Sequence, residues 1–190
     1  MYPDGGFARL RLYGHAIHPS TPAIQAASAP VEELSSALNG GLALAASDEH
    51  FTPSSNILLP GRGKDMGDGW ETARSRGTGH VDWAVIKLGL PGSISKVVVD
   101  TKDFRGNFPR AVRVHGLLSG TVGDSVPSAA DSNWVEIVKG DKRCQADTEH
   151  VFDTDDLTAG SADARVFSHV KLTLVPDGGV KRFRIFGRRE

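Results

Sequence analysis

The chain has one cysteine, Cys144, among 190 residues, so it cannot form an internal disulfide. A lone cysteine favours a reducing compartment over secretion. The sequence also lacks an excess of either charge, because 22 basic and 23 acidic residues leave a formal net charge of −1. Without a basic excess or a long basic stretch, we do not expect a nucleic acid partner.

Long hydrophobic runs are absent too, and the first six residues, MYPDGG, have neither the basic nor the apolar region of a signal peptide. We therefore expect a cytoplasmic protein without a membrane partner. The last four residues, GRRE, are not a peroxisomal address of the Ser-Lys-Leu type. Other import routes leave a peroxisomal location open.

The two ends of the chain repeat each other. Residues 2–14 read YPDGGFARLRLYG and residues 175–187 read VPDGGVKRFRIFG, so seven of the thirteen positions are identical. In both copies a Pro-Asp-Gly-Gly turn precedes alternating apolar and basic residues, which is typical of a β-strand. An alternating segment, 166–175, comes before the second copy, and this pattern predicts a C-terminal β-hairpin.

The first copy has no such incoming strand, so the chain begins in mid-hairpin. We expect a segment of a longer protein that carries two copies of one unit. Residues 1–14 would be the terminal strand of a truncated first repeat. Residues 15–30, rich in Ala, Pro, Ser and Thr, would be a linker, and residues 31–190 the folded domain.

Short apolar segments separated by turn residues indicate the fold class. A short helix is expected between Pro30, which suits a first helical turn, and the terminating Asn39-Gly40-Gly41. Further strands are predicted at 83–88, 94–100, 111–117 and 134–138. Many short strands without alternating helices predict an all-β sandwich or jelly roll with one short helix.

One stretch, residues 61–83, has more charged residues and glycines than a fold requires. A loop of this kind on a rigid sandwich is where a site would lie. It does not match a phosphate-binding loop, because Gly63-Lys64 is followed by Asp65. A solvated connection whose charges pair with one another is an equally open interpretation.

A second polar cluster, residues 100–109, follows the apolar segment 94–99. Strand-end loops often hold catalytic groups, although Asp100 and Asn107 also suit turns. Acidic segments with one histidine occur at 47–51 and 147–152. Each could supply a metal ligand, or each could be a strand end with a satisfied imidazole.

Together these segments resemble the allantoicase family, ureide-pathway hydrolases built from two homologous jelly-roll repeats. The resemblance is carried, in order, by AASDEHF at 45–51, NILL at 56–59, GDGWET at 67–72, Gly79-His80 with Asp82-Trp83, IKLG at 86–89, Asp100-Thr101 with Gly106-Asn107, and the repeated Pro-Asp-Gly-Gly. It places residues 31–187 in the second repeat. The chain departs from the family where Ala73 and Ser75 interrupt an Arg-rich run and where Val81 separates His80 from Asp82.

The resemblance implies a galactose-binding-domain-like jelly roll that converts allantoate and water into ureidoglycolate and urea. Allantoate carries one carboxylate and two ureido groups on a single carbon. An arginine fork should hold the carboxylate, and Arg74 and Arg76 are the candidates. The ureido N–H groups need carboxylate acceptors, for which Asp68 and Glu71 are close in sequence.

Release of urea requires proton transfer, which suits His80 with Asp82 or Asp100 orienting its ring. Lys87 could stabilise charge on the leaving group, unless strand alternation places it on a solvated face. Thr101 and Asn107 complete the substrate-binding candidates. The sequence leaves a divalent metal open as a cofactor, and a homo-oligomer is expected for the full-length protein.

Two alternatives stay open beside this interpretation. Jelly rolls often bind sugars without catalysis, and Trp70 could be a stacking platform or a core residue. The second repeat could also be mainly structural, with the chemistry in the first. Because both are dense in polar residues at strand ends, we expect the loops 68–82 and 100–107 to meet at one end of the sandwich.

Overall fold

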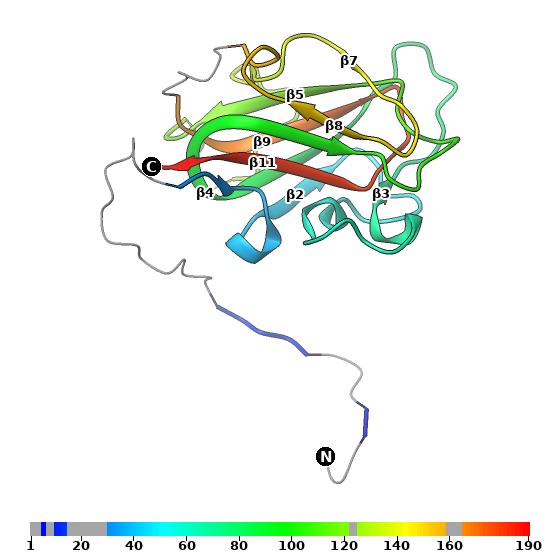
Figure 1. The fold of residues 1–190 in the computed structure, drawn as a ribbon, viewed down its shortest axis with the longest axis horizontal. Helices are drawn as coiled ribbons and strands as arrows, with labels where there is room; N and C mark the ends of the chain where they lie inside the picture. Colours follow the sequence, from blue (N-terminus) through cyan, green and yellow to red (C-terminus); the bar gives the residue numbers. More distant parts are fainter. Residues whose placement is uncertain (1–4, 7–9, 15–29, 122–124, 159–164) are drawn as a thin grey trace.

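The computed structural model describes residues 5–6, 10–14, 30–121, 125–158 and 165–190 (Figure 1). The strands are β1 (Glu32–Glu33), β2 (Leu42–Ala46), β3 (Trp70–Glu71), β4 (Asp82–Asp100), β5 (Ala111–Leu118), β6 (Val135–Glu136), β7 (Lys142–Arg143), β8 (Glu149–Phe152), β9 (Phe167–Val175), β10 (Gly179–Val180) and β11 (Arg182–Arg189). The helical turns are all 3₁₀: η2 (Ala37–Asn39), η3 (Ser54–Leu58) and η4 (Met66–Asp68). In this part of the chain, no helix has the length and apolarity needed to cross a membrane.

Strand β4 takes part in both layers of the sandwich. Its first half pairs with β2 and β9, and its second half pairs with β11 and β8. Between the halves the register shifts from Lys87 to Gly92, and Figure 1 shows the strand curving back on itself there. The two strands predicted at 83–88 and 94–100 are thus one strand that changes sheets at an irregularity. The all-β jelly-roll prediction is confirmed.

The curvature of β4 brings its two ends together. Asp82 is in register with Leu174 at the end of β9, and Asp100 is in register with Arg182 at the start of β11. The Pro-Asp-Gly-Gly turn at 176–179 connects those two strands. We call this end of the sandwich, with both ends of β4 and the 176–179 turn, the loop end.

The predicted C-terminal hairpin is wrong. Strand β9 pairs with β4 and β5, whereas β11 pairs with β1 and the other half of β4. The alternation itself was correct, because Leu172, Leu174, Phe183 and Ile185 are all fully buried. Both strands turn their apolar faces to one core from opposite layers, so the 176–179 turn crosses the sandwich instead of closing a hairpin.

The helix expected between Pro30 and Gly41 is largely replaced by a strand. Glu32 and Glu33 form β1 against β11, and Arg184 Nη1 lies 2.9 Å from Glu33 Oε2. Only η2 is helical, and it ends as predicted, at Gly40 with a φ of 90°. Pairing with β11 overrides the local helical preference, and no α-helix occurs among the described residues.

The core between the layers is aliphatic and aromatic, and Trp70 is its largest fully buried side chain. Its indole Nε1 donates to the Asp48 carbonyl at 2.9 Å. Burial of an aromatic side chain of this size contributes about 4–6 kcal/mol. Trp70 is therefore a core residue, and its interpretation as a sugar-stacking platform is wrong.

The first copy of the repeated motif differs sharply from the second. Residues 1–4, 7–9 and 15–29, which include most of the expected terminal strand and linker, lie outside the described residues. Leu10, Leu12 and Tyr13 are 73%, 89% and 88% exposed and belong to no strand. The counterparts of Leu10 and Leu12, Phe183 and Ile185, are fully buried, and Phe186, the counterpart of Tyr13, is partly buried. The terminal strand stays a prediction for a protein that contains a first repeat.

Candidate active site

The loops 68–82 and 100–107 meet at the loop end, as predicted. Glu71 Oε1 accepts a hydrogen bond from Asn107 Nδ2 at 2.5 Å, and Arg74 Nη2 donates to the Gly106 carbonyl at 3.4 Å. The 176–179 turn joins them, because the backbone N–H of Ser75 donates to Asp177 Oδ2 at 2.8 Å. Three segments that are distant in sequence therefore share one surface.

The position of Glu71 follows from its neighbours. Strand β3 pairs with β10, which sets Glu71 opposite Gly179. Trp70 on one side is fully buried, and on the other side Thr72 Oγ1 accepts a hydrogen bond from Gly178 N at 3.0 Å. Because both neighbours are anchored, the half-buried carboxylate of Glu71 is held at the loop end with little freedom to move.

His80 lies beside Asp82 and not beside Asp100. Its Nε2 is 3.2 Å from Asp82 Oδ1, and the side chain of Asp82 is almost fully buried. Ser47 Oγ donates to the same oxygen at 2.7 Å and accepts from Trp83 N at 2.9 Å. Asp82 Oδ2 is buried and has no hydrogen-bond partner among the described residues. The structure thus places a fixed carboxylate next to the imidazole, where it can orient the ring.

Asp100 is at the same end but is engaged elsewhere. Arg62 donates to both of its carboxylate oxygens, at 2.7 and 2.9 Å, and Lys102 N donates to Oδ1 at 2.9 Å. The hydrogen bond with Asp100 is the main cause of a raised pKa for Arg62. Arg62 is therefore the partner of Asp100, and the expectation that this carboxylate orients His80 has no support in the geometry.

Two more predicted residues are used by the fold. Asp68 Oδ2 accepts from the N–H groups of Lys64 and Asp65, at 2.5 and 3.3 Å, and these hydrogen bonds lower its pKa. Thr101 is fully buried and its hydroxyl donates to the Gln145 carbonyl at 2.6 Å. Both side chains stabilise backbone turns, which leaves little capacity for a substrate.

The last two predicted residues differ in location. Arg76 is exposed on the 68–82 loop and has no side-chain partner within the described ranges. Lys87 is exposed on β4, in register with His169, and lies roughly 17 Å along the strand from Asp82 at the usual rise per residue. Lys87 is thus on the solvated face that strand alternation had left open, away from the loop end.

A cavity of about 450 Å³ opens at the loop end. It is lined by Gly106, Phe108, Arg110, Arg143, Cys144, Pro176 and Asp177. The guanidinium groups of Arg110 and Arg143 belong to no motif and are far apart in sequence. Both residues line this cavity because β7 pairs with the start of β5 and Cys144 N donates to the Arg110 carbonyl at 3.0 Å. No sequence pattern predicts that Arg110 and Arg143 line one cavity. Asp177 was interpreted only as a turn residue, so its carboxylate was not among the predicted site residues.

The cysteine in this cavity is not a nucleophile at neutral pH. Its side chain is buried, and desolvation raises the pKa of Cys144 to about 12. The thiol therefore stays protonated, whereas nucleophilic attack requires the thiolate.

The two acidic segments with histidines serve the fold. Glu49 Oε1 accepts from both Ser54 N and Ser54 Oγ, at 2.8 and 2.6 Å. His150 Nε2 accepts from Gln145 N at 2.9 Å. Across the described part of the chain, no three His, Cys, Asp or Glu side chains gather as metal ligands would.

The fold and the site together define a β-sandwich module whose polar loops converge at one end. Residues 32–190 match the family model described as the allantoicase repeat. The chain is 48% identical over 189 residues to the allantoicase of Neurospora crassa, covering 100% of this chain and 50% of that protein. The chain belongs to the allantoicase family, and it spans about half the length of the curated relatives it matches.

Solved structures agree with this assignment. The crystal structure of allantoicase from Saccharomyces cerevisiae is similar with a TM-score of 0.69 and 47% identity, over 83% of this chain and 43% of that one. A family 32 CBM from C. perfringens NanJ, solved in complex with galactose, has a TM-score of 0.55 at 12% identity, over 83% of this chain and 99% of that one. The latter likeness shows the fold alone.

Proposed function

We propose that the chain is the second repeat of a two-repeat enzyme that hydrolyses allantoate to ureidoglycolate and urea. The observation that carries the proposal is the family match over residues 32–190. The geometry supports it, because the loop end gathers cations for a carboxylate, acceptors for ureido N–H groups and an imidazole.

The substrate carboxylate would lie in the loop-end cavity. Arg110 and Arg143 line it, and Arg74 reaches the carbonyl of Gly106, another lining residue. Guanidinium groups bind carboxylates through paired hydrogen bonds. Arg110 and Arg143 therefore join Arg74 and Arg76 as candidate carboxylate ligands. Asp177, in the same cavity, is a further acceptor for a ureido N–H group.

Hydrolysis replaces one C–N bond at the central carbon with a C–O bond. The oxygen of water binds that carbon, and the departing ureido nitrogen takes a proton to leave as urea. Imidazole can both accept and donate a proton near neutral pH, so His80 would exchange protons with water and the leaving nitrogen. Asp82 would orient the ring, and Glu71, held by Asn107, would orient a ureido group.

A segment exchange tests the function. We would replace the matching 189 residues of the Neurospora crassa allantoicase with this chain and measure urea release from allantoate. We expect the chimera to retain activity within about tenfold of that enzyme, since a segment that keeps the reacting groups preserves transition-state binding. A chimera that folds and releases no urea would contradict the proposal.

We also propose that the full-length protein is a cytoplasmic homo-oligomer that binds neither nucleic acid nor membranes. The near balance of 22 basic and 23 acidic residues supports the absence of nucleic acid binding. Light scattering on the chimera measures its mass directly, and a monomeric mass would contradict the assembly.

A further inference from the structure

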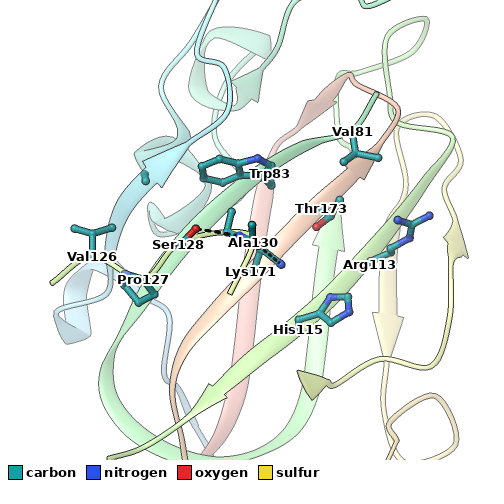
Figure 2. Close-up of a pocket in the computed structure, with 12 residues that line it drawn as sticks. Val81, Trp83, Arg113, His115, Val126, Pro127, Ser128, Ala130, Lys171 and Thr173 are labelled. Carbon is teal, nitrogen blue, oxygen red and sulfur yellow. Dashed lines mark hydrogen bonds between the residues drawn. The ribbon is translucent and has the colours of Figure 1, made fainter. Parts of the chain in front are cut away.

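A second cavity, of about 590 Å³, lies on the outer face of the layer formed by β2, the first half of β4, β9 and β5 (Figure 2). It shares no lining residue with the loop-end cavity. The segment 126–130 forms its opposite wall. None of the residues given a role in the proposed reaction lines this cavity.

Two rows of side chains cross the floor of the cavity. Thr173 on β9 lies between Trp83 on β4 and Arg113 on β5, and His115 lies directly opposite Lys171 in the next row. Figure 2 shows these five side chains on the same face of the sheet. Directly opposite residues of antiparallel strands have Cβ atoms about 5 Å apart, so the polar groups converge on one small volume.

These groups still have hydrogen-bonding capacity. Lys171 Nζ donates one hydrogen bond, to the Ala129 carbonyl at 2.7 Å, and an ammonium has three N–H donors. Arg113 binds Asp141 through Nε and Nη2, which fixes the guanidinium, and Nη1 has no hydrogen-bond partner among the described residues. His115 Nδ1 is buried without a hydrogen-bond partner among the described residues, an arrangement that is unfavourable unless a ligand or water satisfies it.

The electrostatics of the floor favour a negative ligand. Burial is the main cause of a lowered pKa for both Lys171 and His115, and the charge of Lys171 lowers the pKa of His115 further. Asp131 offsets this for Lys171 and Glu136 for His115, but no lining residue of the cavity is acidic. An anion in the cavity would offset the cost of burying the Lys171 ammonium.

The remaining walls are apolar. Trp83 and Val81 lie on one side, and Val126 and Pro127 lie on the other. We propose that this cavity binds a small organic carboxylate with a flat or apolar body. The carboxylate contacts Lys171 and His115, and the body packs between Trp83 and the 126–130 segment.

Benzoate is a suitable probe, with benzamide as its uncharged counterpart of the same shape. Binding to the whole chain is measured by calorimetry and by NMR shifts of the Trp83 indole N–H. A charge-assisted hydrogen bond contributes about 1.5–3 kcal/mol, so we expect benzamide to bind at least about tenfold more weakly than benzoate. Equal binding of the two compounds, or no saturable binding of benzoate, would overturn the proposal.

Lysine variants locate the site. Lys171→Met should weaken benzoate binding about tenfold or more, for the same reason, and should leave benzamide binding unchanged. Lys171→Arg keeps the charge and should retain benzoate binding even if the methionine variant is poorly folded. Lys96→Met is the matched control, because Lys96 lies over Phe186 in the opposite layer. A loss with Lys96→Met equal to that with Lys171→Met, or a loss with neither, would show that the cavity is not the site.

Discussion

Individual polar residues fall into two groups that the sequence does not separate. Asp68 and Thr101 are occupied by backbone groups, whereas Arg110 and Arg143 face a cavity. The hydroxyl of Thr101 bonds to the backbone of Gln145 and Thr148, which are 44 and 47 positions away. Residue types predicted the polar end of the domain, but only tertiary pairing decides which side chains remain available for a ligand.

Glu71 provides a direct test at this scale. Glu71→Gln in the chimera should slow urea release about 100-fold, because the carboxylate acceptor is lost while the side chain keeps its shape. The hydrogen bond from Asn107 can still reach the amide oxygen, so the melting temperature should change little. Full activity would contradict the role of Glu71, and parallel loss of activity and stability would indicate a structural residue.

Cys144 offers a second test, because it is the only cysteine in the chain. With its pKa raised from 9.0 to about 12 by burial, the native thiol should react with a disulfide reagent at pH 8 about 1,000-fold more slowly than the unfolded chain. Because the folded chain holds the thiol proton more tightly than the unfolded chain, protonated Cys144 stabilises the fold. This contribution to the free energy of unfolding is complete below pH 9 and falls as the pH rises towards 12. Equal reaction rates in the native and unfolded chains would show that Cys144 is accessible.

At the scale of elements, alternation predicted the strands well and their pairing poorly. The apolar faces of β9 and β11 were correct, but a hairpin and a crossing between layers produce the same pattern of buried residues. Two strands were predicted at 83–88 and 94–100, where the structure has the single bent strand β4. The glycine and proline residues between them are typical both of a turn and of an irregularity within a strand. The pairing of β4 with β9 and β11, which are distant in sequence, decides between a turn and an irregularity.

The repeated turn contains its own matched control. A Cβ on Gly179 would overlap the ring of Phe104, whereas a Cβ on its counterpart Gly6 would meet no atom within 4 Å. Gly179→Ala should therefore lower the free energy of unfolding by about 1–3 kcal/mol, as overpacking does. Gly6→Ala should leave it unchanged within error. Denaturant unfolding measures both, and equal effects would mean that the two copies of the turn are packed alike.

At the scale of the whole molecule, the chain spans about half the length of the curated relatives it matches. Leu10 and Leu12 are exposed here, although their counterparts in the second copy, Phe183 and Ile185, form part of a core. We propose that a first repeat in the full-length protein buries these residues, which at about 25 cal/mol per Å² of apolar surface would be favourable. The motif resemblance anticipated the family, whereas the sequence cannot show whether one repeat holds a complete site.

We expect the isolated chain to be folded over residues 32–190 but to release urea from allantoate at least about 100-fold more slowly than the chimera, since incomplete catalytic assemblies lose most of their rate. Circular dichroism confirms folding in the same samples. Comparable rates for chain and chimera would place a complete site inside one repeat.

The central claim is that the chemistry takes place at the loop end. The most direct measurement compares two variants of the chimera, His80→Ala at the loop end and Lys87→Ala on the solvated face of β4. We predict that His80→Ala lowers the rate of urea release about 100-fold or more, as expected for a positioned acid–base group. Lys87→Ala should lower the rate less than about twofold. A large loss with Lys87→Ala and normal turnover with His80→Ala would contradict the central claim.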